Sequence, residues 1–157
     1  MKNDKTDNHE QLFWEEIDRL FPDMIKAIAS LSKKSYLSIT NLRTGITWWS
    51  ERAMDYFGMK ENYTIRGMEK ANRKIHPDDV ATFKRGFKER VDGKNLDTAW
   101  EYRIQDGDSY NRFNAMARVL YDEQKQPFII IIRYDNYGIS DEVDSVTGLY
   151  TEPALNR

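Results

Sequence analysis

His76, Asp78 and Asp79 lie together in the stretch "IHPDDV" and form the cluster that could suggest a metal site or an acid–base site. A histidine beside an aspartate can serve as a general acid–base pair, and histidine with carboxylates can hold a metal ion. Consecutive residues of a helix point about 100° apart, so both aspartates cannot aim at one ion together with the histidine. Proline followed by acids is favoured at the positive start of a helix. We therefore interpret the group as a helix start and assign no metal site.

Other chemistry is limited by composition. The sequence contains no cysteine, which excludes disulfides, thiolate zinc sites, iron–sulfur clusters and cysteine nucleophiles. Its second histidine, His9, lies in a polar N-terminal stretch without a partner residue nearby. Haem is not expected, because a haem iron needs a protein ligand in a suitable setting.

Charge and hydropathy restrict the partners and the location. The 157 residues carry a formal net charge of -2 and no long run of like charges, so nucleic acid is not an expected partner. The N-terminus lacks the apolar region of a secretory signal. The longest apolar run, residues 128–132, is far shorter than the roughly 20 residues of a membrane helix. We expect a cytoplasmic protein without membrane insertion.

The N-terminal part is expected to be a mobile tail over residues 1–10 and a helical segment over residues 11–34. Apolar side chains recur in it every three or four residues, at Phe13, Ile17, Phe21, Met24, Ile28 and Leu31. Pro22 interrupts this stripe and predicts a kink or two short helices. The stripe fits either packing on the chain's own domain or the seam of a dimer.

The rest of the chain reads as two strands, several short helices and three longer strands. Alternating apolar residues predict short strands over residues 36–42 and 46–49. A short helix should begin after Ser50 and stop at Gly58. Weaker helical character follows over residues 62–74, and a clear helix over 75–93. The three longer strands are predicted over residues 97–106, 110–122 and 127–135.

This order of elements resembles a PAS domain over residues 35–137. The motifs that carry the resemblance are "HPDD" at residues 76–79, "EYRIQDG" at residues 101–107 and the "WWS" strand end. The resemblance implies an α+β fold with a five-stranded antiparallel sheet in the order 2-1-5-4-3, helices on one face and an extra N-terminal helix. It also implies a sensory role.

The stretch "DSVTGLYTEPALNR", residues 144–157, resembles the entry of a GGDEF domain, whose members make cyclic di-GMP from two GTP molecules. Asp144 and the "TGL" at residues 147–149 match the family pattern, whereas Val146 and the pair Thr151-Glu152 depart from it. Residues 138–157 are therefore expected to be a linker and the first residues of a truncated GGDEF domain. No catalytic residue is assigned, and this chain is not expected to be an enzyme itself. A cyclase needs two GTP-bearing subunits, which implies a parallel homodimer through residues 11–33.

A ligand-binding core is one implication of the PAS resemblance. Some PAS domains hold a flavin that forms an adduct with cysteine, which this chain cannot do. A flavin without covalent chemistry, a small metabolite or an empty core all remain open, so the cofactor is unknown. The candidate pocket residues are Phe57, Phe87, Trp100, Tyr102, Phe113 and Asn114.

Arg103 and Asp135 are the candidates for signal transmission. In the resembling family an acid at the end of the last strand pairs with an arginine of the "EYR" strand and links the sheet to the outgoing chain. Here Asn136 and Tyr137 follow that acid in place of the usual isoleucine and threonine. A bidentate pair would fix the outgoing chain, whereas two surface charges would contribute less than about 1 kcal/mol.

Three functions follow from these observations. The first is a sensory PAS module that dimerises and relays a signal to a C-terminal diguanylate cyclase domain. The second is a free-standing protein-interaction domain with a filled core. The third is a small cavity-bearing α+β enzyme that uses His76 with an aspartate as its acid–base pair.

Overall fold

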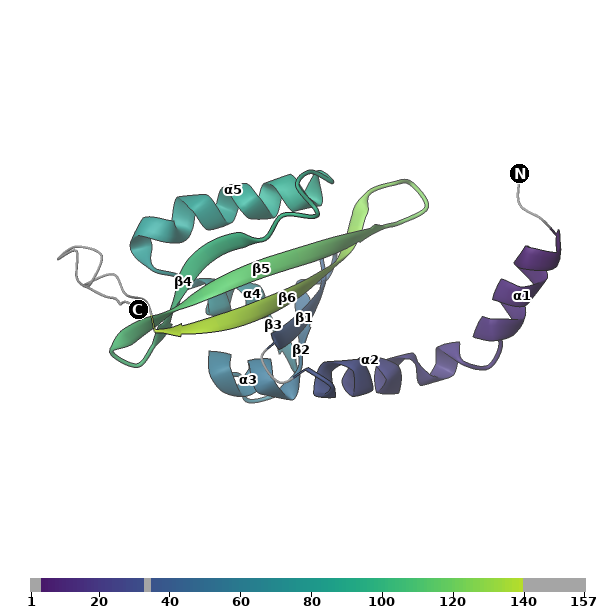
Figure 1. Cartoon of the computed structure of the whole chain (residues 1–157), viewed down its shortest axis with the longest axis horizontal. Helices are drawn as coiled ribbons and strands as arrows, with labels where there is room; N and C mark the ends of the chain where they lie inside the picture. Colours follow the sequence, from purple (N-terminus) through teal and green to yellow (C-terminus); the bar gives the residue numbers. More distant parts are fainter. Residues whose placement is uncertain (1–3, 33–34, 140–157) are drawn as a thin grey trace. The chain divides into compact units, whose positions relative to one another are not determined.

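The computed structural model describes residues 4–32 and 35–139, with side chains from residue 8 onward. The chain divides into two compact units, Met1–Lys33 and Lys34–Arg157, which are described separately below (Figure 1). Residues 144–157, which resemble the entry of a GGDEF domain, lie outside the described residues. Of the expected linker, residues 138 and 139 belong to the last strand.

The N-terminal unit consists of helix α1 (Asp4–Trp14), the 3-10 turn η1 (Asp18–Leu20) and helix α2 (Phe21–Ser30). Pro22 lies in the first turn of α2, where a missing backbone N–H costs nothing. The predicted division into two short helices is confirmed. Residues 4–10, expected as a tail, instead form most of α1. A helix whose first two turns bear no apolar face leaves no periodicity in the sequence.

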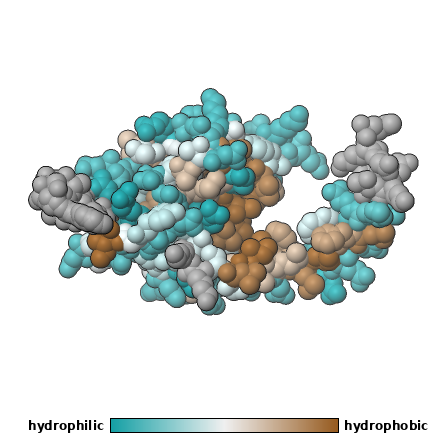
Figure 2. Space-filling model, in the orientation of Figure 1, coloured by the Kyte–Doolittle hydropathy of each residue, from teal (hydrophilic) through white to brown (hydrophobic). Residues whose placement is uncertain are grey.

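Large apolar side chains of this unit are exposed. They are Leu12, Phe13, Trp14, Leu20, Phe21, Ile28 and Leu31. Figure 2 shows hydrophobic atoms following the course of α2. Helices as short as α1 and α2 are marginal in water unless an apolar face is covered.

The second unit is built on a six-stranded antiparallel sheet in the order β3-β2-β1-β6-β5-β4. Its strands are β1 (Ser35–Asn41), β2 (Ile46–Trp49), β3 (Tyr63–Ile65), β4 (Trp100–Asp106), β5 (Ser109–Tyr121) and β6 (Pro127–Ile139). The α+β class is confirmed. The prediction of five strands in the order 2-1-5-4-3 was wrong, because the additional strand β3 lies outside β2 at one edge.

Strand β3 and helix α4 (Gly67–Asn72) share the stretch for which only helical character was predicted. Three residues are too few to show alternation. The strand is fixed by its middle residue, since the indole Nε1–H of Trp49 donates to Thr64 Oγ1 at 2.7 Å. The backbone at Gly67 lies close to the Thr64 side chain. A Cβ at Gly67 would lie 2.2 Å from Thr64 Oγ1, so glycine is required.

Helices α3 (Glu51–Phe57) and α5 (Val80–Val91) lie within the segments predicted to be helical, and a 3-10 turn, η2 (Pro77–Asp79), precedes α5. The Ser50 hydroxyl accepts the N–H of Ala53 at 3.3 Å, and Gly58 ends α3 with φ at 72°. Both helices and α4 pack on the same face of the sheet. The buried core on this face comprises Trp49, Ala53, Phe57, Ala71, Ile75, Phe83, Trp100, Tyr102, Ile104, Phe113, Ala115, Ala117, Ile130, Ile132 and Tyr134.

Trp100 joins α5 to the start of β4. Gly86 leaves room for its ring, because a Cβ at that position would lie 2.9 Å from the indole Cγ. The guanidinium of the buried Arg90 stacks 4.3 Å from the Trp100 ring centroid. Arg90 also donates to the carbonyl oxygens of Gly86 and Thr98. The C-terminal end of α5 and the first residues of β4 therefore pack closely against each other (Figure 1).

Candidate functional site

The predicted pocket residues meet in the core in two aromatic groups. Phe57 of α3 lies beside Phe113 of β5, with ring centroids 6.5 Å apart. Trp100 and Tyr102 of β4 lie 6.0 Å apart. The partly buried Phe87 packs against the same core from α5. Five of the six candidates therefore pack in the core between sheet and helices.

Asn114 is the exception and lies on the opposite face. Phe113 and Ala115 are buried in the core, and successive residues of a strand point to opposite faces. The buried amide of this strand is Asn111, whose Nδ2 donates to Tyr56 Oη at 3.0 Å and to Asp106 Oδ2 at 3.1 Å. The alternation that places Phe113 inward also places Asn111 there. The sequence therefore already indicated that Asn111, and not Asn114, is the inward-facing amide.

Three buried donor atoms come from Arg90 of α5 and from Trp100 and Tyr102 of β4. Among the described residues, the buried side-chain polar atoms without a hydrogen-bond partner are Arg90 Nε, Trp100 Nε1 and Tyr102 Oη. Burial raises the pKa of Tyr102, so its hydroxyl keeps its proton. By contrast, the buried Tyr134 hydroxyl is hydrogen-bonded to Ser38 Oγ at 3.1 Å. Because buried donors are nearly always paired, this part of the core has unused capacity to donate.

The "HPDD" segment closes the outer edge of β4. Asp79 accepts hydrogen bonds from Arg103 Nε and Nη2 and from the Arg103 backbone N–H, each at 2.8 Å. The backbone N–H of His76 donates to Arg103 O at 2.9 Å, and Gln105 N–H donates to Lys74 O at 2.7 Å. Main chain and carboxylate together bind three backbone groups of this strand edge, the N–H and C=O of Arg103 and the N–H of Gln105.

His76 and the aspartates do not converge on one point. His76 Nδ1 accepts the backbone N–H of Asp78 at 3.1 Å, and its ring packs on Tyr110 with centroids 4.6 Å apart. The Asp78 carboxylate is exposed, whereas that of Asp79 is held by Arg103. In the described part of the chain, no group of three acidic or histidine side chains is placed to hold a metal ion.

The structure corrects the predicted pair of Arg103 and Asp135. The bidentate partner of Arg103 is Asp79. Asp135 accepts the hydroxyl of Ser35 and lies 3.2 Å from Arg133 Nη2. Strand β5 runs between β4 and β6 and separates the strands that carry the two predicted partners. Arg103 does form a bidentate pair, but its acid comes from the segment before α5.

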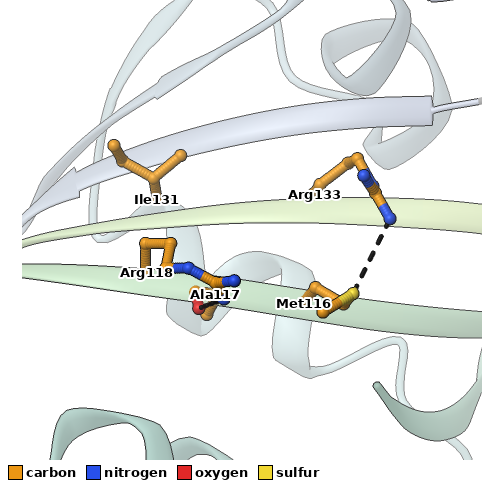
Figure 3. A pocket seen from close by; sticks show the side chains of 5 residues that line it. All are labelled: Met116, Ala117, Arg118, Ile131 and Arg133. Atoms are coloured by element: carbon orange, nitrogen blue, oxygen red, sulfur yellow. Dashed lines mark hydrogen bonds between the residues drawn. The ribbon is translucent and has the colours of Figure 1, made fainter. Parts of the chain in front are cut away.

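A shallow groove of about 250 Å³ lies over β5 and β6, lined by Met116, Ala117, Arg118, Ile131 and Arg133 (Figure 3). Both arginines are already engaged. Arg118 donates to Leu96 O at 2.7 Å, and Arg133 reaches Met116 Sδ at 3.7 Å as well as Asp135. Arg118 Nη2 also lies 3.3 Å from Asp97 Oδ1, so each arginine of the groove has a carboxylate partner.

Comparison with known proteins identifies the fold family. A family model described as "PAS fold" matches residues 46–132, more than half of the chain. The chain belongs to the PAS family. The predicted resemblance over residues 35–137 is thereby confirmed at the level of the family. None of the curated proteins matches the sequence.

Solved PAS structures share the fold at low sequence identity. A sensory box histidine kinase/response regulator from Burkholderia thailandensis E264 has a TM-score of 0.56 at 17% identity, covering 80% of this chain and 89% of its own. The N-terminal domain of a diguanylate cyclase with PAS/PAC sensor from Marinobacter aquaeolei has a TM-score of 0.55 at 15% identity, covering 67% and 96%. These similarities show that the fold is shared. No helix among residues 4–32 and 35–139 is long and apolar enough to span a bilayer.

We predict that Asp79→Asn destabilises the domain by about 1.5–3 kcal/mol at neutral pH, the range for hydrogen bonds to a charged group. The hydrogen bonds from Arg103 hold the pKa of Asp79 below its ordinary value of 3.8. A carboxyl whose pKa is lowered by folding stabilises the folded state above its unfolded pKa, and this contribution disappears as pH falls through the folded value. Urea unfolding from neutral pH to below 3.8 should therefore show the difference from wild type shrinking with acidity.

Asp78→Asn is the matched control, because the Asp78 side chain is 78% exposed and that of Asp79 only 19%. Its effect on the free energy of unfolding should stay within about 0.5 kcal/mol. Equal effects of the two substitutions would show that the hydrogen bonds between Asp79 and Arg103 contribute nothing specific to the free energy of unfolding.

Proposed function

We propose that this chain is a cytoplasmic sensory module that dimerises and relays a signal to a C-terminal diguanylate cyclase domain. The observation that carries the proposal is the succession of a PAS domain and the "DSVTGL" pattern at residues 144–149. The diguanylate cyclase of Marinobacter aquaeolei gives a precedent for a PAS domain in such a protein. The module itself performs no chemical step.

The relay would work by a shift between two packings of the sheet and its helices. A signal changes the populations of two states only if it binds them with different affinities. Strand β6 is the element through which such a shift would leave the domain, since it ends at Ile139 and contacts both β1 and β5.

The output is tested on the longer gene product. The codons after that for Arg157 should encode a Gly-Gly-acid-Glu-Phe loop within about one domain length. The purified longer protein should convert GTP to cyclic di-GMP, measured by chromatography of the nucleotides. A different output domain, or a stop codon directly after Arg157, would refute the cyclase assignment.

Dimerisation would use residues 11–33, in which seven large apolar side chains between Leu12 and Leu31 are exposed. Light scattering should give twice the chain mass of 18.6 kDa, and Ile28→Asp in α2 should shift the protein to monomer. Ser30→Asp adds the same charge on the opposite side of the helix, roughly 160° away, and should leave the dimer intact. A wild-type monomer at all concentrations, or equal effects of both substitutions, would contradict this interface.

A second candidate function, small-molecule sensing in the core, is favoured by the three unpaired donors. They would suit a ligand that carries oxygen acceptors. The protein is purified in its folded state and then denatured, and mass spectrometry of the released small molecules should reveal such a ligand. Tyr102→Phe should retain less of it. Tyr134→Phe is the control, because the Tyr134 hydroxyl already bonds Ser38. No released molecule would instead favour a filled-core interaction domain.

A further inference from the structure

Side chains join the first residues of β1 to the last residues of β6. Ser35 and Asp135 are paired across the two strands, and the Ser35 hydroxyl donates to the Asp135 carboxylate. Asn136 Nδ2 donates to Tyr36 Oη at 3.3 Å. The first and the last described strands of this unit, β1 and β6, are therefore held together by side chains as well as by the sheet.

Asn136 also shapes the exit of β6. Opposite β5 the register shifts between the pairs Phe113–Asn136 and Asn111–Ile139, so β6 bulges at this point. Gly138 adopts a φ of 89° within the bulge, and its N–H donates to Asn136 Oδ1 at 2.8 Å. One amide group thus holds the bulge with its oxygen and Tyr36 with its nitrogen.

Tyr36 in turn connects this exit to the core. Its ring is stacked on Tyr56 of α3, with centroids 5.4 Å apart and an interplanar angle of 21°. Tyr56 lies edge-on to Phe57 at 5.3 Å and is fixed at its hydroxyl by Asn111. Burial raises the pKa of Tyr56 to about 12, so this hydroxyl remains a neutral hydrogen-bonding group.

We propose that Tyr36 and Asn136 form a latch that couples the position of α3 to the exit of β6. In this structure the latch is closed: the Tyr36–Tyr56 stack holds the Tyr36 hydroxyl against Asn136, and Asn136 in turn fixes the bulge. Displacement of α3 by a change in the core moves Tyr56, draws Tyr36 away and frees the backbone at Gly138. The latch rests on the proposed relay function, and it assigns transmission to Tyr36 and Asn136 in place of Arg103 and Asp135.

Amide hydrogen exchange of this chain tests the latch directly at the Gly138 N–H. Tyr36→Phe keeps the aromatic stack and removes only the hydroxyl that Asn136 reaches. Exchange at Gly138 should become about three- to tenfold faster, the equivalent of one net hydrogen bond. Tyr134→Phe is the matched control, since it removes a hydroxyl from the same strand pair, bonded to Ser38, and should leave Gly138 at the wild-type rate.

A second variant tests the link to α3. Tyr56→Leu removes the stacking partner while leaving Tyr36 and Asn136 in place, and it should also accelerate exchange at Gly138. Wild-type exchange in Tyr36→Phe, equal acceleration in Tyr134→Phe, or no response to Tyr56→Leu would each overturn the latch.

These readouts need no output domain, so they stand even if no cyclase follows. Conversely, a longer protein whose cyclase responds to signal while Tyr36→Phe leaves Gly138 unchanged would retain the proposed function and refute the latch.

Discussion

The antiparallel pairing of β1 with β6 is the constraint on which the rest of this domain depends. It joins the first strand to the last through seven residue pairs, from Ser35–Asp135 to Asn41–Ile129. All the intervening helices and strands must fit around this pair, and α3, α4 and α5 all contribute to the one core that covers it. Such non-local pairing costs loop-closure entropy before any apolar surface is buried. Burial of the aromatic core must therefore supply much of the free energy that offsets this cost.

Local signals in the sequence were sufficient where one residue type satisfies one geometric need. Ser50 and Gly58 delimit α3 because a hydroxyl cap and a positive φ each have few alternatives. Pro22 marks the start of α2 for the same reason. The long strands β5 and β6 extend over enough residues for alternation or apolar runs to appear. These elements, with the family motifs, were enough to predict the fold class.

The remainder depends on contacts that sequence spacing does not contain. Strand β3 is held by the indole of Trp49, fifteen residues earlier, rather than by its own pattern. The acid that binds Arg103 lies twenty-four residues before it. It belongs to a motif whose residues are already accounted for by the start of a helix, so nothing in the sequence points to a second role. Asn114 was misplaced although alternation excludes it from the face of Phe113, so that error was avoidable. The unpaired donors of Arg90, Trp100 and Tyr102 can be recognised only when the surrounding atoms are in place.

The segment that carries Asp79 has a consequence for self-association of the sheet. An uncovered strand edge is a template on which another chain can add a strand, and this is a common route to aggregation. Along β4 that template is occupied by Lys74, His76 and the Asp79 carboxylate. At the other edge, β3 offers only the three residues Tyr63–Ile65. The same motif that starts α5 therefore also helps to keep the sheet from extending into fibrils, and leaves copies of the domain to meet through surfaces other than strand edges.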